Sequence, residues 1–149
     1  MMRGDRAVMT REKFKLIHSE LIMQVQCIES DLKLIYAGMH SGDFEENLDM
    51  LEKANLGTVI KKLKDLDYSD GHPDLSKQDY VLLEQIREIR NYWCHQCFLD
   101  YVYIQDDWQR ERAFQQIAQR LSEDENRTWD LHEHLEKLRQ KMLQKYDRI

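Results

Sequence analysis

The sequence has 149 residues, about the length of one domain, which is enough to bury a hydrophobic core without disulfides or metal. Its formal net charge of −6 argues against a protein whose whole surface binds nucleic acid, while a local basic site stays open. The single proline and five glycines are too few for the tight turns of an all-β fold, so the composition predicts long helices.

The first predicted helix begins at Thr10 and extends to the region between Gly38 and Gly42. Its apolar residues recur at alternating spacings of three and four, which is the pattern of an amphipathic helix in a bundle. They are Phe14, Ile17, Leu21, Val25, Ile28, Leu32, Ile35 and Met39. Beyond the turn, Asp43 with Glu46 resembles a capping box and predicts the start of a second helix.

The second predicted helix covers residues 44–66, with Asn55 on its inner stripe, and ends at the loop of residues 68–73. Ser76 with Asp79 then predicts the N-terminus of a third helix. The core stripe of that helix consists of Leu82, Ile86, Ile89, Trp93 and Cys97.

A break is expected at residues 105–107, followed by a shorter helix from Trp108 to Leu121. Ser122 with Glu125 resembles a further cap, which predicts a separate final helix through Leu131, Leu135, Leu138 and Met142. We therefore expect an all-α single domain over residues 1–149, built as an antiparallel up-and-down helical bundle of four long helices plus one short helix.

The sequence also predicts where the protein resides. No apolar run approaches the roughly 18 residues that span a bilayer, and Met1 to Asp5 are not followed by the apolar core of a signal peptide. The three cysteines, Cys27, Cys94 and Cys97, cannot all pair within one chain. We expect a cytoplasmic protein with reduced thiols and no membrane partner.

The third predicted helix contains the sharpest motif of the chain, Arg90-Asn91-Tyr92-Trp93-Cys94-His95. Here the sequence resembles the HEPN superfamily, whose ribonuclease members carry an arginine, often followed by asparagine, and a histidine a few residues later. The segment Leu56-Gly57-Thr58-Val59-Ile60 looks like the Leu-Gly-x-Leu-Ile segment on the preceding helix of some HEPN families. Toxins whose motif continues His-x-Tyr would need tyrosine where this chain has Cys97, so regulation by tyrosine modification is not implied.

The HEPN resemblance implies a specific function and specific partners. It implies a dimeric, metal-independent endoribonuclease of the toxin–antitoxin or abortive-infection type, with an RNA substrate. By family analogy it also implies a neutralising protein partner, a nucleotidyltransferase-type antitoxin. The site residues that follow from the matched motif are Arg90, Asn91 and His95.

The motif residues suit cleavage of RNA by its own 2′-hydroxyl. This reaction needs a group that titrates near neutral pH to move a proton, and a fixed cation for the charge that develops on phosphate. His95 is the expected proton carrier and Arg90 the expected phosphate clamp. Asn91 lies one helical turn before His95, where its amide can orient the imidazole or contact phosphate. The reaction requires no metal or other cofactor.

The helical wheel separates the two principal site residues. At about 100° per residue, Arg90 and His95 lie roughly 140° apart, so one chain does not direct both side chains into one pocket. His95 points away from the core stripe, and Phe98, Leu99 and Val102 extend an apolar surface on that side. This surface predicts a homodimer in which a twofold axis brings two copies of the motif to one groove.

A non-catalytic scaffold or binding module is the alternative function. Such a module would use the second apolar face to bind itself or another helical protein. Carboxylates packed around Arg90 would favour it, whereas Arg87, Arg90 and lysines converging on one cleft would count against it. The nearby lysines are themselves interpreted as the solvated face of a helix and not as site residues: Lys61, Lys62 and Lys64.

A third interpretation concerns the Cys-x-x-Cys pair formed by Cys94 and Cys97. That spacing occurs in redox pairs and in half of a zinc site, for which His132 and His134 would be distant ligands. The pair lies inside a predicted helix and not at a helix N-terminus, which would lower the pKa of a thiol. Packing roles are therefore the expectation for both cysteines.

Overall fold

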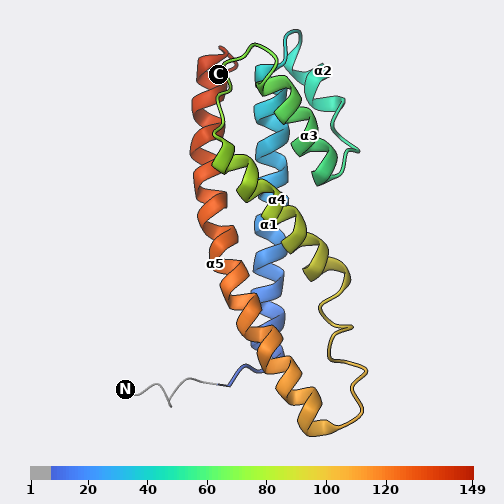
Figure 1. Cartoon of the computed structure of the whole chain (residues 1–149). Helices are drawn as coiled ribbons and strands as arrows, with labels where there is room; N and C mark the ends of the chain where they lie inside the picture. Colours follow the sequence, from blue (N-terminus) through green and yellow to red (C-terminus); the bar gives the residue numbers. More distant parts are fainter. Residues whose placement is uncertain (1–7) are drawn as a thin grey trace, which may run out of the picture.

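The structure, a computed structural model, describes residues 8–149, and all regular secondary structure in that range is helical. The helices are α1 (Arg11–Met39), α2 (Phe44–Asp49), α3 (Leu56–Asp67), α4 (Lys77–His95) and α5 (Asp107–Lys145) (Figure 1). The predicted all-α class is thus confirmed for these residues. The signal-peptide prediction concerns Met1 to Asp5, which lie outside the described residues. Within residues 8–149, no helix has the length and apolar character needed to cross a bilayer.

Helix starts are the features that the sequence predicts best. The Thr10 side chain accepts a hydrogen bond from the Lys13 N–H, and α1 begins at the next residue. Asp43 caps α2 in the same way, and Ser76 with Asp79 forms a reciprocal capping box at α4. These local bonds satisfy N–H groups that a helix cannot pair internally, so they depend on few residues and are readable from sequence.

The second long helix predicted over residues 44–66 is wrong, because two shorter helices replace it. α2 ends at Asp49, and α3 begins after Asn55, whose side chain accepts the Thr58 N–H at 2.8 Å. Asparagine is among the strongest N-cap residues, and Gly57 lowers helix propensity just beyond it. Leu51 is fully buried in the connecting segment, so the apolar stripe continues although the helix does not.

The short helix and the separate final helix predicted near the C-terminus are one continuous helix. α5 runs from Asp107 to Lys145 without a break at Ser122. Two polar residues, Asp124 and Thr128, interrupt the apolar stripe of α5, so the sequence suggests a break where there is none. Both form hydrogen bonds: Asp124 accepts the Trp93 Nε1–H at 2.8 Å, and the Thr128 hydroxyl donates to the Asp124 carbonyl at 2.7 Å. Because these bonds remove the cost of burial, the helix needs no interruption there.

The third helix ends earlier than the sequence predicts. α4 stops at His95, and residues 96–103 form turns instead of carrying the helix to the break at residues 105–107. Asp100 stabilises these turns by accepting the Tyr92 hydroxyl at 2.7 Å and the Gln96 side chain at 2.8 Å. Cys97 and Tyr101 are buried directly after the helix and hold the turns against the core.

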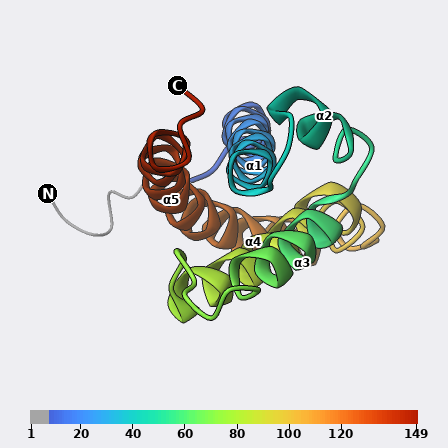
Figure 2. The ribbon, with the colours of Figure 1, turned by 90° about the horizontal axis from the view of Figure 1, so that it is seen from above.

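The antiparallel up-and-down prediction fails for the two longest helices, which run parallel. Their starts meet through the Arg11–Glu111 ion pair at 3.0 Å, and their later turns meet through Arg139–Asp31 at 2.7 Å. The segment before α3 turns the chain, so α3 also ascends in Figure 1, α4 descends, and α5 ascends again. Seen from above, α3 and α4 lie on one side of the α1–α5 pair (Figure 2). The five helices are therefore not four long ones plus one short one.

Candidate functional site

The motif residues occupy the last two turns of α4. Asn91 and His95 are exposed, Arg90 is half-buried, and His95 is the final residue of the helix. Trp93, between them, is almost completely buried, and its indole N–H binds Asp124. The Trp93 carbonyl also lies 2.7 Å from His18 Nε2 of α1. Trp93 therefore anchors the end of α4 so that Asn91 and His95 face outward.

The structure brings Asn91 and His95 together but not Arg90. Because α4 is helical through His95, Asn91 lies one turn before it on the same face. Arg90 lies about 140° around the helix from His95, as the helical wheel predicts. Within residues 8–149, Arg90 forms no ion pair with a carboxylate, which is the contact that would favour a purely structural role.

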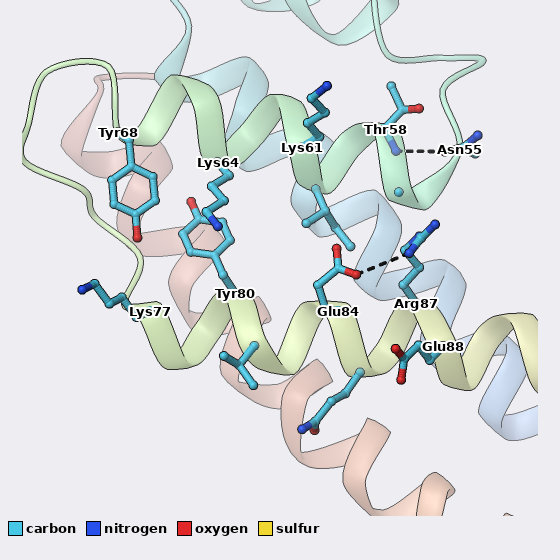
Figure 3. A pocket seen from close by; sticks show the side chains of 14 residues that line it. Asn55, Thr58, Lys61, Lys64, Tyr68, Lys77, Tyr80, Glu84, Arg87 and Glu88 are labelled. Carbon is cyan, nitrogen blue, oxygen red and sulfur yellow. Dashed lines mark hydrogen bonds and ion pairs between the residues drawn. The ribbon is translucent and has the colours of Figure 1, made fainter.

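A groove of about 1150 Å³ lies between α3 and α4, and it was not predicted from the sequence. None of the three motif residues lines it. Its charged side chains are four cations and two carboxylates, in a chain whose net charge is −6. They are Lys61, Lys64, Lys77, Arg87, Glu84 and Glu88 (Figure 3). Two lysines interpreted as a merely solvated face thus line a concave basic surface.

Arg87 lies across the first turn of α3 because Gly57 leaves room for it. A Cβ at position 57 would stand 2.8 Å from the Arg87 Nε, which is too close for an unshifted contact. Arg87 makes one ion pair among the described residues, with Glu84 at 3.4 Å, and both side chains are about half exposed. Such a pair contributes little to stability, so the guanidinium stays available at this end of the groove.

Aromatic rings form the other end of the groove, where α3 ends and α4 begins. The Lys64 Nζ lies 6.0 Å from the Tyr68 ring centroid and 5.7 Å from that of Tyr80. Burial, with the Asp67 carboxylate second, raises the pKa of Tyr80, whose hydroxyl donates to Asp67 at 2.7 Å. Asp67 also accepts the Leu75 N–H, so this end of the groove is held in place by buried bonds.

An exposed apolar patch lies beside the motif, on the turns that follow α4. Its members are Phe98, Leu99, Val102 and Tyr103, with exposed fractions between 39% and 75%. Phe98 is anchored at one edge, because its ring lies 6.0 Å from that of Phe14 in α1. The sequence predicted an apolar surface here as a helix face, and the structure places it on turns.

The Cys-x-x-Cys pair does not have the properties of a redox centre. Cys94 is exposed, whereas Cys97 is buried and donates to the Trp93 carbonyl. Burial raises the pKa of the Cys97 thiol to about 11. One of the two distant zinc ligands is also misplaced: His134 lies 2.9 Å from Asp79, at the opposite end of α4 from Cys94. In residues 8–149, no group of three or more potential ligands could hold a metal ion.

We expect Cys94 to react with a maleimide or iodoacetamide much faster than Cys97 at neutral pH. A rise in the pKa of the Cys97 thiol from the ordinary 9.0 to about 11 lowers its thiolate fraction roughly a hundredfold. The burial of Cys97 also blocks the reagent. Mass spectrometry of peptides from briefly treated native protein measures both rates. Protein unfolded in denaturant, where the cysteines should react alike, is the control. Equal rates in the native protein would contradict the buried position of Cys97.

Comparison of the chain with protein-family models, curated proteins and solved structures finds no match. The HEPN resemblance therefore rests on the motif residues alone.

Proposed function

We propose that the protein is a metal-independent endoribonuclease of the HEPN type, acting in toxin–antitoxin or abortive-infection defence. The observation that carries this proposal is the outward placement of His95 and Asn91 on one exposed face of α4. An imidazole, which can carry a proton, and an amide then lie side by side where an RNA strand has access. A protein antitoxin of the nucleotidyltransferase type is the partner that this function calls for.

The proposed reaction is a transesterification. The RNA 2′-oxygen attacks phosphorus and forms a new P–O bond, and the bond from phosphorus to the 5′-oxygen of the next nucleotide breaks. His95 takes the proton from the 2′-hydroxyl or returns one to the leaving oxygen, while Arg90 binds the charge on the phosphate oxygens. The products are a 2′,3′-cyclic phosphate and a 5′-hydroxyl, and no water or metal is consumed.

The apolar patch supports a homodimer, and a dimer would supply the second proton carrier. Since Arg90 and His95 of one chain point in different directions, a second copy of the motif would complete the site across a twofold axis. We expect wild-type protein to be dimeric at micromolar concentration in light scattering. Leu99→Asp should weaken the dimer at least about tenfold, because it places a charge in the patch.

Met50→Asp is the matched control for the dimer. Met50 is also an exposed apolar residue, at 57%, but it lies in the segment between α2 and α3. The control should remain dimeric. A wild-type protein that is monomeric at all micromolar concentrations would contradict the dimer and the composite site together.

The same patch favours a second candidate function, a scaffold or binding module without catalysis. Exposed apolar residues next to one another mark a binding surface whatever the chemistry of the neighbouring residues. Circular dichroism and light scattering cannot separate the two functions, because both predict a folded dimer. RNA cleavage separates them.

Incubation with single-stranded RNA in the presence of a chelator tests the ribonuclease proposal. We expect shortened products whose ends are a 2′,3′-cyclic phosphate and a 5′-hydroxyl, identified by mass spectrometry. Phosphate at the 5′ end would indicate a different reaction. No cleavage by folded protein free of bound partner, across several RNAs, would favour the scaffold function.

A further inference from the structure

We propose that the groove between α3 and α4 binds the phosphate backbone of single-stranded RNA and leads the strand to His95. The choice of RNA rests on the proposed ribonuclease function. The charge, shape and position of the groove rest on the structure alone.

The groove and the motif belong to one continuous face of α4. On a helix with about 100° per residue, the groove-lining residues Lys77, Glu84 and Glu88 lie within roughly 20° of His95. Asn91 lies about 40° from that line. Arg87, which also lines the groove, lies about 80° from His95 and one turn before Asn91. The side of α4 that α3 covers near its start is therefore the same side that carries His95 at its end.

Figure 3 shows how α3 sets the length of this groove. Lys77 and Tyr68 lie at one end of the groove, and Arg87 and Glu88 lie at the other, beside the start of α3. α4 continues beyond that point, so its last two turns are not covered by α3. From Lys77 to Arg87 the helix rises about 15 Å, which matches about four stacked nucleotides at roughly 3.4 Å each.

The side chains of the groove match a single strand better than other polyanions. Lys61 and Lys64 come from α3, and Lys77 and Arg87 come from α4, so both helices contribute cations to the lining of the groove. The two walls of the groove belong to neighbouring helices, whose axes in packed pairs are typically about 8–10 Å apart, so the groove is narrow and suits one strand better than a duplex. Tyr68 adds an aromatic ring at one end, and aromatic rings on a basic groove are the usual platform for unpaired bases.

The carboxylates of the groove argue against an acidic peptide as the occupant. Glu84 and Glu88 are both on α4: Glu84 lies between Lys77 and Arg87, and Glu88 lies beside Arg87 at one end of the groove. They repel carboxylates and phosphates alike, but they can accept hydrogen bonds from the amino groups of bases, which acidic side chains lack. A single-stranded RNA presents both the negative phosphates and these amino groups, so it satisfies the whole set of charges.

Binding of a labelled single-stranded RNA of about twelve nucleotides tests the inference, measured by fluorescence anisotropy. The protein carries His95→Ala in every sample, so the RNA stays intact. Adding Lys61→Glu or Lys64→Glu should weaken binding about tenfold each, and should lower the steepness of its salt dependence. Lys62→Glu is the matched control, because Lys62 is an exposed neighbour with the same charge change that does not line the groove. It should change the affinity less than about twofold.

Each other outcome of this experiment overturns the inference. Equal weakening by Lys61→Glu and Lys62→Glu would mean that only net charge matters. Tighter binding of the corresponding duplex would exclude a single-strand groove. Absence of RNA binding, with polyglutamate bound instead and lost in Lys61→Glu, would assign the groove to an acidic protein partner.

Failure of the groove inference and failure of the ribonuclease proposal give different results. RNA that binds in the groove but is not cut by protein with an intact His95 would overturn the ribonuclease and leave the groove standing. RNA that is cut by protein with an intact His95, while Lys61→Glu binds and cuts as well as the unsubstituted chain, would overturn the groove alone.

Discussion

His95→Ala and Arg90→Ala should each slow RNA cleavage by about a hundredfold or more. The first substitution removes the proposed proton carrier, and positioned acid–base catalysis contributes on the order of 10²–10⁴ in rate. The second removes the cation that we propose to stabilise the charge developing on the phosphate, an effect of about 10²–10³ for a single well-placed donor. Asn91→Ala should slow cleavage less, because the amide only orients the imidazole or contacts the phosphate. Single-turnover cleavage of a defined RNA in chelator measures all three rates.

Matched controls separate loss of the site from general damage. His72→Ala removes an exposed histidine from the loop between α3 and α4, and Arg112→Ala removes an exposed arginine from α5. Both should cleave at the wild-type rate. Circular dichroism should show the same helical content in every variant, since Asn91 and His95 are exposed and Arg90 is half-buried. Equal cleavage by all variants would point to a contaminating nuclease or to another site.

Most helix starts could be predicted because their causes are local, but the start of α3 at the Asn55 cap was missed. At Thr10, Asp43 and Ser76 a side-chain oxygen accepts an N–H three residues later, and a helix begins at the next residue, although only Ser76 and Asp79 form a reciprocal capping box. Helix lengths could not be predicted in the same way. Ser122 lies inside α5 and does not begin a helix. The polar stripe that suggested a break there includes Asp124, which is buried and accepts a hydrogen bond from Trp93, a residue thirty-one positions earlier in the chain.

Part of the candidate site also has a local cause and could be predicted, whereas the groove depends on contacts between distant segments. The neighbourhood of Asn91 and His95 follows from their spacing on one helix, so the sequence predicts it. The groove does not follow from any one helix. It exists because α3 and α4 lie side by side and Gly57 lets Arg87 approach, so lysines on a seemingly solvated face become one wall of a cleft. The glycine in the first turn of α3 and the polar stripe Lys77, Glu84 and Glu88 are the signals that could have indicated it.

The placement of the whole motif depends on one buried side chain, and removing it should have the largest effect on stability. Trp93 is 1% exposed, and its ring lies 6.3 Å from that of Phe14, on α1. Trp93→Ala should lower the free energy of unfolding by about 3–5 kcal/mol, because it removes a large buried ring and leaves a cavity. The thermal midpoint should fall by about 10 °C or more. Thermal and urea unfolding followed by circular dichroism measure both quantities.

Trp93→Phe isolates the hydrogen bond to Asp124 from the packing of the ring. Phenylalanine fills most of the space but cannot donate, so the buried carboxylate keeps only longer contacts, to Arg120 at 3.7 Å and Arg127 at 3.5 Å. A loss of about 1–3 kcal/mol is expected for an unsatisfied buried group. Trp129→Ala is the control, since Trp129 is 45% exposed and should change stability by no more than about 0.5 kcal/mol. If Trp93→Ala lowered the free energy of unfolding no more than Trp129→Ala, Trp93 would not hold the end of α4 in place. The outward direction of His95 would then need another cause.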